Sequence, residues 1–229
     1  MSDTTDIVEA LSSGKVIEVD QNGRFQLTDS FENAVSRFET EFEGLDNTER
    51  IDTVVDHVEQ LKLAESLVHT CEGHPKLLAS YLALRGHLEE FSHDEVLPIY
   101  CSLDQFRPNP PPIEGVPGPF LPIHGDHLEA YTGLFEKSLV YVWLDDCDPC
   151  DLLKEDFEVL FETPSTTIAL FAVYGPDASR YLQERFDVVG GPTTLFMHGN
   201  QVWMRHQGAV RRAVLETDLE KFHELSVEP

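Results

Sequence analysis

The sequence has few basic residues and few cysteines, and it has no long apolar run. Of its 229 residues, 16 are Lys or Arg and 42 are Asp or Glu, which gives a formal net charge of −26. A surface this acidic repels the phosphates of nucleic acids and the headgroups of anionic membranes. No uncharged apolar stretch of about 18 residues is present, so we expect no membrane span. Nucleic acids and membranes are therefore not among the predicted partners.

The first residues also lack the pattern of a secretory signal. Residues 1–6 are acidic and contain no apolar segment of the kind that a secretory signal needs. We therefore expect a cytoplasmic protein.

The negative charge is spread over the whole chain. Residues 1–123 contain 8 basic and 23 acidic side chains, and residues 124–229 contain 8 and 19. Such a surface repels itself at low ionic strength, and molar salt screens that repulsion because the Debye length falls to about 3 Å. The composition resembles that of proteins from salt-accumulating halophilic archaea, and we expect such a source. An acidic protein that is not salt-adapted is the alternative.

Four cysteines are too few for a disulfide framework in a chain of this length. Cys71 and Cys101 each lie within sequence that reads as helical, where a buried free thiol is the usual role. Cys147 and Cys150 form a close pair that needs a separate explanation.

Residues 1–106 predict a mainly helical N-terminal domain with a short β-hairpin. Apolar residues around Asn22-Gly23 indicate the two strands of that hairpin. Asp29-Ser30 is the predicted N-cap of one helix, Asn47-Thr48 begins a long helix that runs to about Leu67, and Pro75 opens another. A last helix is expected from about His93 to Phe106. Helices beside a hairpin suggest a winged-helix DNA-binding domain, but the acidic charge disfavours it, and an interaction or scaffold domain is preferred.

Residues 107–124 are rich in proline and glycine. Proline cannot continue a helix or donate to a sheet ladder, so this segment is expected to be a stiff, extended connector. A proline-rich recognition ligand is the alternative.

Residues 125–229 show alternating strand and helix patterns. The apolar run Leu139–Leu144 predicts a strand buried on both faces. A second buried strand is expected over Thr166–Val173, and His198-Gly199-Asn200 indicates a hairpin near the C-terminus. The element order predicts an α/β domain in which helices cover both faces of a mixed sheet.

The Cys147-Asp148-Pro149-Cys150 motif directly follows the first predicted strand and opens a helix. A helix N-terminus has free N–H groups and a partial positive charge, and both stabilise a thiolate. The thiolate is the attacking species in disulfide exchange. In this interpretation Cys147 attacks a disulfide, and Cys150 resolves the mixed disulfide that results.

Over roughly residues 125–225 the chain resembles the thioredoxin family. Leu139–Cys150 is similar to the strand that leads to the family's active site, including Trp143, and Gly191-Pro192-Thr193 is similar to its cis-proline turn. Phe196, Gly199 and Gly208 match the hairpin that follows. The resemblance implies a thioredoxin-like fold, with Pro192 beside the dithiol and supporting the substrate backbone. It also implies disulfide-containing protein substrates, an electron-donor reductase and no bound cofactor or metal.

Several positions depart from the family pattern. Asp146 stands where tryptophan is usual, and Asp148-Pro149 replaces Gly-Pro. The family's buried acid falls at Tyr141, and its usual lysine partner is missing, which leaves proton transfer from Cys150 without an obvious assistant. Gly191 replaces a branched apolar residue. Four carboxylates near the pair should raise the pKa of the Cys147 thiol, most strongly at low salt: Asp145, Asp146, Asp148 and Asp151.

The predicted function is therefore thiol–disulfide oxidoreductase, which in a reducing cytoplasm would reduce protein disulfides. One alternative is a non-catalytic thioredoxin-fold scaffold whose helical domain recognises a partner. Another is half of a zinc site, which would need further ligands. His69, Cys71 and His74 form the loose cluster that could supply them.

Overall fold

The computed structural model describes residues 4–163 and 167–225, and it describes residues 4–6 by their backbone alone. The described chain forms two compact units. The N-terminal unit contains the chain up to Pro110 together with Glu129–Leu134, and the C-terminal unit contains Pro111–Leu128 and the chain from Phe135 onward. Within the described ranges, no helix is long and apolar enough to cross a membrane.

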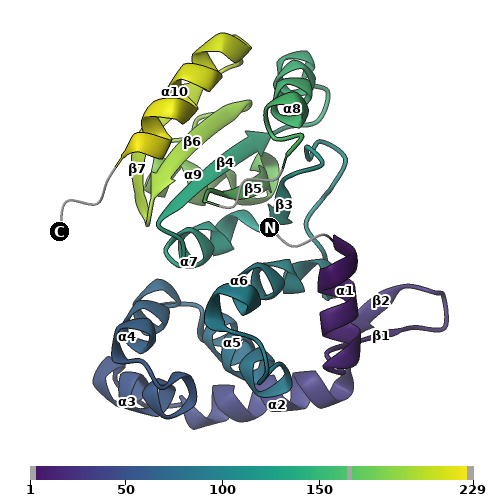
Figure 1. Cartoon of the computed structure of the whole chain (residues 1–229), viewed down its shortest axis with the longest axis vertical. Coiled ribbons are helices and arrows are strands. Elements are labelled where there is room, and N and C mark those ends of the chain that lie inside the picture. The colour runs from purple at the N-terminus through teal and green to yellow at the C-terminus, as the bar shows by residue number, and fades with distance from the viewer. Residues whose placement is uncertain (1–3, 164–166, 226–229) are drawn as a thin grey trace. The chain divides into compact units, whose positions relative to one another are not determined.

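The N-terminal unit is mainly helical, as predicted, with one small hairpin (Figure 1). Strand β1 pairs antiparallel with β2 around the predicted Asn22-Gly23 turn. The elements of this unit are α1 (Thr4–Ser13), β1 (Ile17–Val19), β2 (Phe25–Leu27), α2 (Asp29–Glu41), α3 (Asn47–Val58), α4 (Leu61–Thr70), α5 (Pro75–His87), α6 (His93–Ser102) and the 3-10 helix η1 (Leu103–Phe106).

Three predictions in this unit were wrong in detail. The N-cap of α2 is Thr28, whose hydroxyl accepts a hydrogen bond from the N–H of Phe31. The single long helix expected from Asn47 to Leu67 is two helices, because Glu59 adopts a left-handed conformation with φ of 58° and ends α3. The last expected helix also divides, since α6 gives way to η1 after Ser102. Helix α1 was not predicted.

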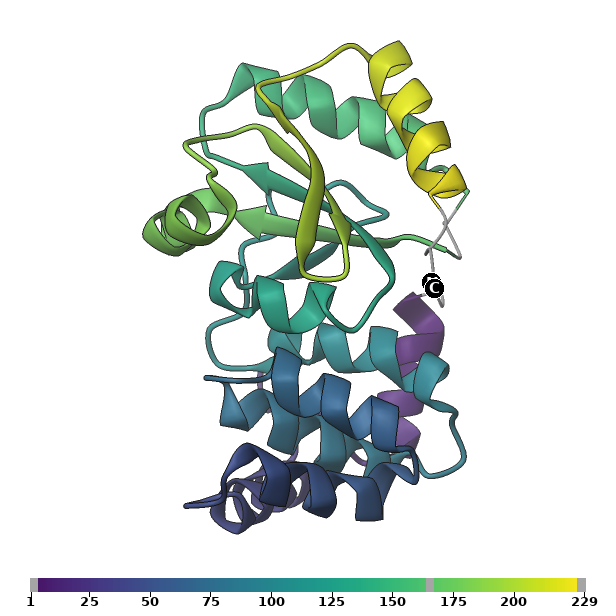
Figure 2. The ribbon, with the colours of Figure 1, turned by 90° about the vertical axis from the view of Figure 1, so that its left-hand side faces the viewer.

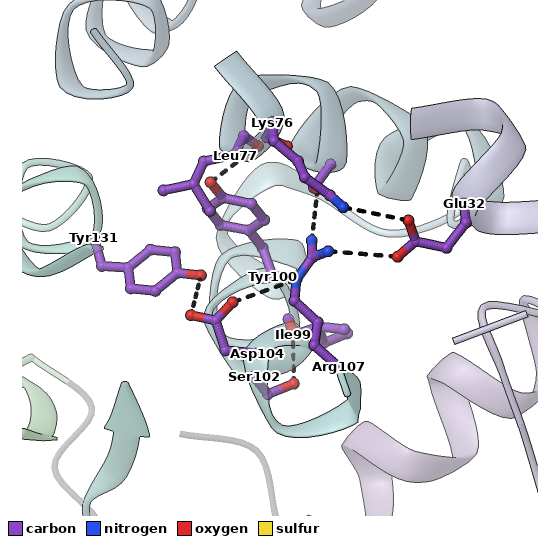
Figure 3. Close-up of polar contacts among 10 residues, drawn as sticks. Glu32, Lys76, Leu77, Ile99, Tyr100, Ser102, Asp104, Arg107 and Tyr131 are labelled. Atoms are coloured by element: carbon purple, nitrogen blue, oxygen red, sulfur yellow. Dashed lines mark hydrogen bonds and ion pairs between the residues drawn. The ribbon is translucent and has the colours of Figure 1, made fainter. Parts of the chain in front are cut away.

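A buried polar network stabilises the N-terminal unit (Figure 3). Asp104 is fully buried, and its carboxylate accepts a hydrogen bond of 3.0 Å from the hydroxyl of Tyr131. The other carboxylate oxygen lies 3.4 Å from Nε of Arg107, as an ion pair rather than a well-aligned hydrogen bond. Arg107 also donates to the hydroxyl of Ser80 at 2.8 Å and lies 3.4 Å from Glu32. A buried charge needs partners of this kind to offset its desolvation.

The C-terminal unit is built on a five-stranded mixed sheet with the strand order β3-β5-β4-β6-β7. Strands β3, β5 and β4 are parallel, while β6 is antiparallel to both β4 and β7. The strands are β3 (Leu121–Ile123), β4 (Lys137–Trp143), β5 (Ala169–Tyr174), β6 (Thr193–His198) and β7 (Gln201–Gln207). Every residue of β4 is buried, as its apolar run predicts.

Helices cover both faces of this sheet (Figures 1 and 2). The face with Leu139 and Tyr141 packs against Phe157 of α8 (Asp148–Leu160) and Phe222 of α10 (Arg212–Glu224) in one core cluster. Helix α9 (Ser179–Phe186) lies on the other side of the sheet in Figure 2. The predicted fold class, a mixed sheet between helices preceded by a helical region, is confirmed.

Some boundaries from residue 125 onward differ from the predictions. The helix expected over residues 125–135 is a 3-10 turn, η2 (Gly125–His127), followed by the short α7 (Leu128–Thr132). The helix expected from Asp177 begins as another 3-10 turn, η3 (Gly175–Ala178). Strand β5 starts at Ala169, and Thr166, where that strand was expected to begin, lies outside the described residues.

Residues 111–123, which are part of the predicted connector, pack on the sheet. Leu121–Ile123 forms edge strand β3, parallel to β5. Phe120 enters the core, with its ring centroid 4.9 Å from that of Phe157. Gly115 lies directly against the indole of Trp143, where even a Cβ atom would come within 2.2 Å of the ring. This segment therefore covers the sheet face next to the end of β4.

Candidate functional site

Cys147 and Cys150 form a disulfide at the N-terminus of α8. Cys147 is the N-cap residue, and its carbonyl accepts hydrogen bonds from the N–H groups of Cys150, at 2.8 Å, and Asp151, at 3.1 Å. Pro149 lies in the first turn of α8, where backbone N–H groups have no partner within the helix. The N–H that proline lacks is therefore not needed for a helical hydrogen bond. The local sequence therefore fixes the pair at the junction of β4 and α8.

The two sulfur-bearing residues differ in exposure. Cys150 is 2% exposed and belongs to the core cluster, whereas Cys147 is half-buried at its margin. An incoming thiol or disulfide therefore reaches Cys147 more readily than Cys150. After reduction, the helix N-terminus would favour a thiolate at Cys147.

Tyr141 lies directly beneath the motif. Its side chain is fully buried, and its hydroxyl donates a 2.8 Å hydrogen bond to the carbonyl of Cys150. Burial raises the pKa of the Tyr141 hydroxyl, and the nearby Asp151 carboxylate raises it further. The hydroxyl is therefore neutral at ordinary pH, and it anchors the first turn of α8 without placing a charge in the core.

Pro192 lies at the same end of the sheet as the cysteine pair. The Gly191–Pro192 peptide bond is cis, and Pro192 is buried. The next residue, Thr193, pairs with Val142, near the end of β4 from which the chain runs on to Cys147. The carbonyl of Pro192 accepts a 2.7 Å hydrogen bond from the N–H of Gly208.

The structure gives a reason for glycine before this proline. A Cβ atom on Gly191 would lie 2.8 Å from Cγ of Leu144 and 3.3 Å from the carbonyl of Val142. The Leu144 side chain fills the space that a branched residue at position 191 would need.

The four aspartates of the motif region are all exposed. Asp146 has φ of 49°, a left-handed conformation that aspartate tolerates better than most residues. Asp145 accepts a hydrogen bond from the hydroxyl of Tyr174. That bond is the main cause that raises the pKa of Tyr174 to about 12. The effect of Asp146 and Asp148 on Cys147 stays a prediction.

Sequence reasoning missed three contacts that shape this site. Nothing in the sequence indicates that Tyr174 bonds to Asp145, because the pair is 29 positions apart. The contact between Gly115 and Trp143 lies in a segment interpreted as a connector. The hydrogen bond from Tyr141 had a detectable signal, since a polar residue in an otherwise apolar strand needs a partner when buried.

The remaining cysteines are free and buried, as expected. Burial raises the pKa of the Cys71 thiol to about 11, and it also raises the pKa of Cys101. Such thiols are poor nucleophiles. No group of three or more His, Cys, Asp or Glu side chains within the described part of the chain is placed to hold a metal ion.

No protein-family model matches the chain, and no curated protein matches it. Among solved structures, a mutant thioredoxin from Halobacterium salinarum NRC-1 is 22% identical and covers 48% of this chain and 96% of its own, with a TM-score of 0.40. A Malassezia sympodialis thioredoxin is also 22% identical and covers 44% and 88%, with a TM-score of 0.40. Mitochondrial thioredoxin 3 from Saccharomyces cerevisiae is 14% identical and covers 44% and 94%, with the same score. At these identities and scores the likenesses assign no function to this chain.

The C-terminal unit is nevertheless thioredoxin-like in its own arrangement. Its mixed sheet, its helices on both faces and its disulfide-bonded Cys147–Cys150 pair at the β4–α8 junction are the features that the sequence resemblance implies.

Proposed function

We propose that this protein exchanges thiols and disulfides with protein substrates and, in its reduced form, reduces their disulfides. The observation that carries the proposal is the Cys147–Cys150 disulfide at a helix N-terminus, with one partner half-buried and the other in the core. Helix-terminal dithiols of this kind combine an activated outer thiol with a protected resolving thiol.

Each residue has a proposed role. The Cys147 thiolate attacks a substrate disulfide, and the Cys150 thiol then displaces the reduced substrate and re-forms the disulfide. Pro192 presents a rigid edge for the substrate backbone beside the pair. Asp146, Asp148 and Pro149 tune the first thiol. The dithiol is restored by a partner reductase in a cytoplasmic setting, and the chemistry requires no cofactor in this chain.

Covalent trapping tests these roles. The Cys150→Ser variant cannot resolve a mixed disulfide, so it should accumulate protein partners that are released by dithiothreitol. The Cys147→Ser variant is the matched control, because it retains one cysteine of the pair but lacks the attacking thiol. Trapping that is equal in the two variants, or absent in both, contradicts the proposal.

The same experiment addresses the alternative of a binding scaffold. The departures at Tyr141, Asp146 and Asp148 from the family pattern favour that alternative. A scaffold would bind partners without a covalent link, and partner capture would then be the same for wild type and for both serine variants.

A further inference from the structure

The charged side chains next to the Cys147–Cys150 pair in the sequence are all negative. Asp146 and Asp148 flank Cys147 in the chain, and both are exposed. Asp151 follows in the first turn of α8. The Cα atoms of Asp146 and Asp148 each lie about 3.8 Å from that of Cys147, so a substrate that reaches the Cys147 sulfur passes close to these two residues.

Other segments of the chain contribute further carboxylates near the end of β4. Tyr174 packs against Trp143 with 4.7 Å between ring centroids and donates its hydroxyl hydrogen to Asp145. Glu114 and Asp177 both act on Tyr174, since their negative charges contribute to its raised pKa. Three separate segments therefore meet at the end of β4. We call their carboxylates the acidic rim: Glu114, Asp145, Asp146, Asp148, Asp151 and Asp177.

One basic group offsets this rim in part. Lys154 is the one basic residue of α8, and its ammonium group donates to the backbone carbonyl of Glu114 at 3.0 Å. One positive charge is fewer than the six carboxylates of the rim. On the side of Pro192, residues 188–191 carry no charge, and Val189 is 68% exposed. A substrate that enters between the cysteine pair and Pro192 therefore meets negative charge on one side and an uncharged surface on the other.

We infer that the acidic rim selects disulfides carried by positively charged polypeptide segments, in which Lys or Arg lies close to the substrate cysteine. This inference rests on the proposed function, because the selected reaction is thiol–disulfide exchange at Cys147. Opposite charge near the reacting sulfur raises the rate of productive encounter, whereas like charge lowers it, and salt weakens both effects.

The exchange transfers two electrons from the protein dithiol to the substrate disulfide. The Cys147 thiolate attacks one sulfur of the substrate disulfide, a new S–S bond forms, and the second substrate sulfur leaves as a thiolate. The Cys150 thiolate then attacks the Cys147 sulfur and releases the first substrate sulfur. The protein dithiol is oxidised to the disulfide, the substrate disulfide is reduced to two thiols, and two protons pass from the protein thiols to the products.

Two small disulfides of opposite charge test the inference on the full-length reduced chain. Cystamine carries two positive charges, and glutathione disulfide has a net negative charge. Acid quenching followed by mass spectrometry gives the second-order rate constant for each. The rim variant is Asp146→Asn with Asp148→Asn. The control is Glu158→Gln with Glu162→Gln, which removes the same charge near the C-terminal end of α8. Glu158 is about 15 Å from Asp148 by helix rise, and Glu162 lies just beyond the helix.

The readout is the cystamine rate constant divided by the glutathione disulfide rate constant. Intrinsic disulfide reactivity cancels when this ratio is compared between variants, and so does any change in the Cys147 pKa. We expect the rim variant to lower the ratio about tenfold at 0.1 M salt and less than about twofold at 1 M. Far-ultraviolet circular dichroism confirms that each protein is folded at each salt concentration.

The outcomes separate the two claims. A ratio that falls equally in the rim and control variants, or does not change with salt, overturns the charge selection and leaves thiol–disulfide exchange standing. Failure of the reduced wild type to react with either disulfide overturns the proposed function, and the charge selection with it.

Discussion

The hydroxyl of Tyr141 donates a 2.8 Å hydrogen bond to the backbone carbonyl of Cys150. This bond connects the central strand β4 to the first turn of α8, in which the cysteine pair lies. Position 141 is where the thioredoxin family usually has a buried acid. The Tyr141 hydroxyl gives this position a structural role that requires no charge. A buried acid without its basic partner would be costly in the same place.

The Tyr141→Phe variant tests this role. It removes one buried hydrogen bond while keeping the ring in the core, so the free energy of unfolding should fall by about 0.5–1.5 kcal/mol. Urea denaturation of the oxidised protein measures this change. Tyr174→Phe is the control, because its hydroxyl bonds at an exposed position. A loss no larger than that of the control would show that the Tyr141 bond does not stabilise the helix start.

Alkaline pH should destabilise the protein. Burial raises the pKa of Tyr81 to about 12, and it also raises the pKa values of Tyr100, Tyr131 and Tyr141. Unfolded tyrosine ionises near pH 10, so above that pH the unfolded chain binds fewer protons than the folded chain, and stability falls as pH rises. Below pH 10 these groups contribute a constant stability.

Two measurements check the alkaline prediction. Denaturant midpoints between pH 8 and pH 11 should be level up to about pH 10 and then decline. Phenolate absorbance should appear together with unfolding for the buried tyrosines. Full phenolate absorbance in a protein that is still folded at pH 10.5 would contradict the prediction.

The aspartates beside Cys147 should slow its reaction with alkylating agents. The helix N-terminus favours the thiolate by about 0.3–1 kcal/mol, which is less than one pKa unit, and nearby carboxylates oppose it. Asp146→Trp with Asp148→Gly should therefore lower the pKa of Cys147. The reduced variant should react faster with iodoacetamide at neutral pH than the wild type, most clearly at low salt. Equal rates at low salt would show that these aspartates do not control the thiol.

Low salt should destabilise the whole chain. The net charge of −26 is spread over both halves of the sequence, and its self-repulsion is screened in molar salt. Thermal unfolding of the oxidised protein from millimolar to molar potassium chloride should give a midpoint that rises with salt. A midpoint that is level or falls with added salt would be incompatible with the halophilic interpretation of the composition.

Local patterns predicted the elements that surround the site. The apolar run of β4, the cysteine motif at the start of α8 and the hairpin glycine at position 199 are each specified within a few residues of sequence. The strands and helices at these positions follow from hydrophobic burial and turn chemistry alone.

Contacts between distant residues could not be predicted in this way. Asp104 looks like an ordinary helical aspartate in the sequence, yet it is fully buried because Tyr131 and Arg107 satisfy it. The end of α3 depends on one left-handed residue, Glu59, whose type does not indicate that conformation. Proline suggested a connector at residues 107–124, although Pro122 is accommodated in the edge strand β3.

The most direct test of the account is catalytic reduction of a model protein disulfide. Reduction of insulin by dithiothreitol in molar potassium chloride would be followed with the wild type, Cys147→Ser and Cys150→Ser at equal concentration. The account predicts acceleration by the wild type, none above the uncatalysed rate by Cys147→Ser, and weaker acceleration by Cys150→Ser, whose mixed disulfide must be resolved by dithiothreitol. A wild-type rate no greater than that of Cys147→Ser would contradict thiol–disulfide exchange at this site.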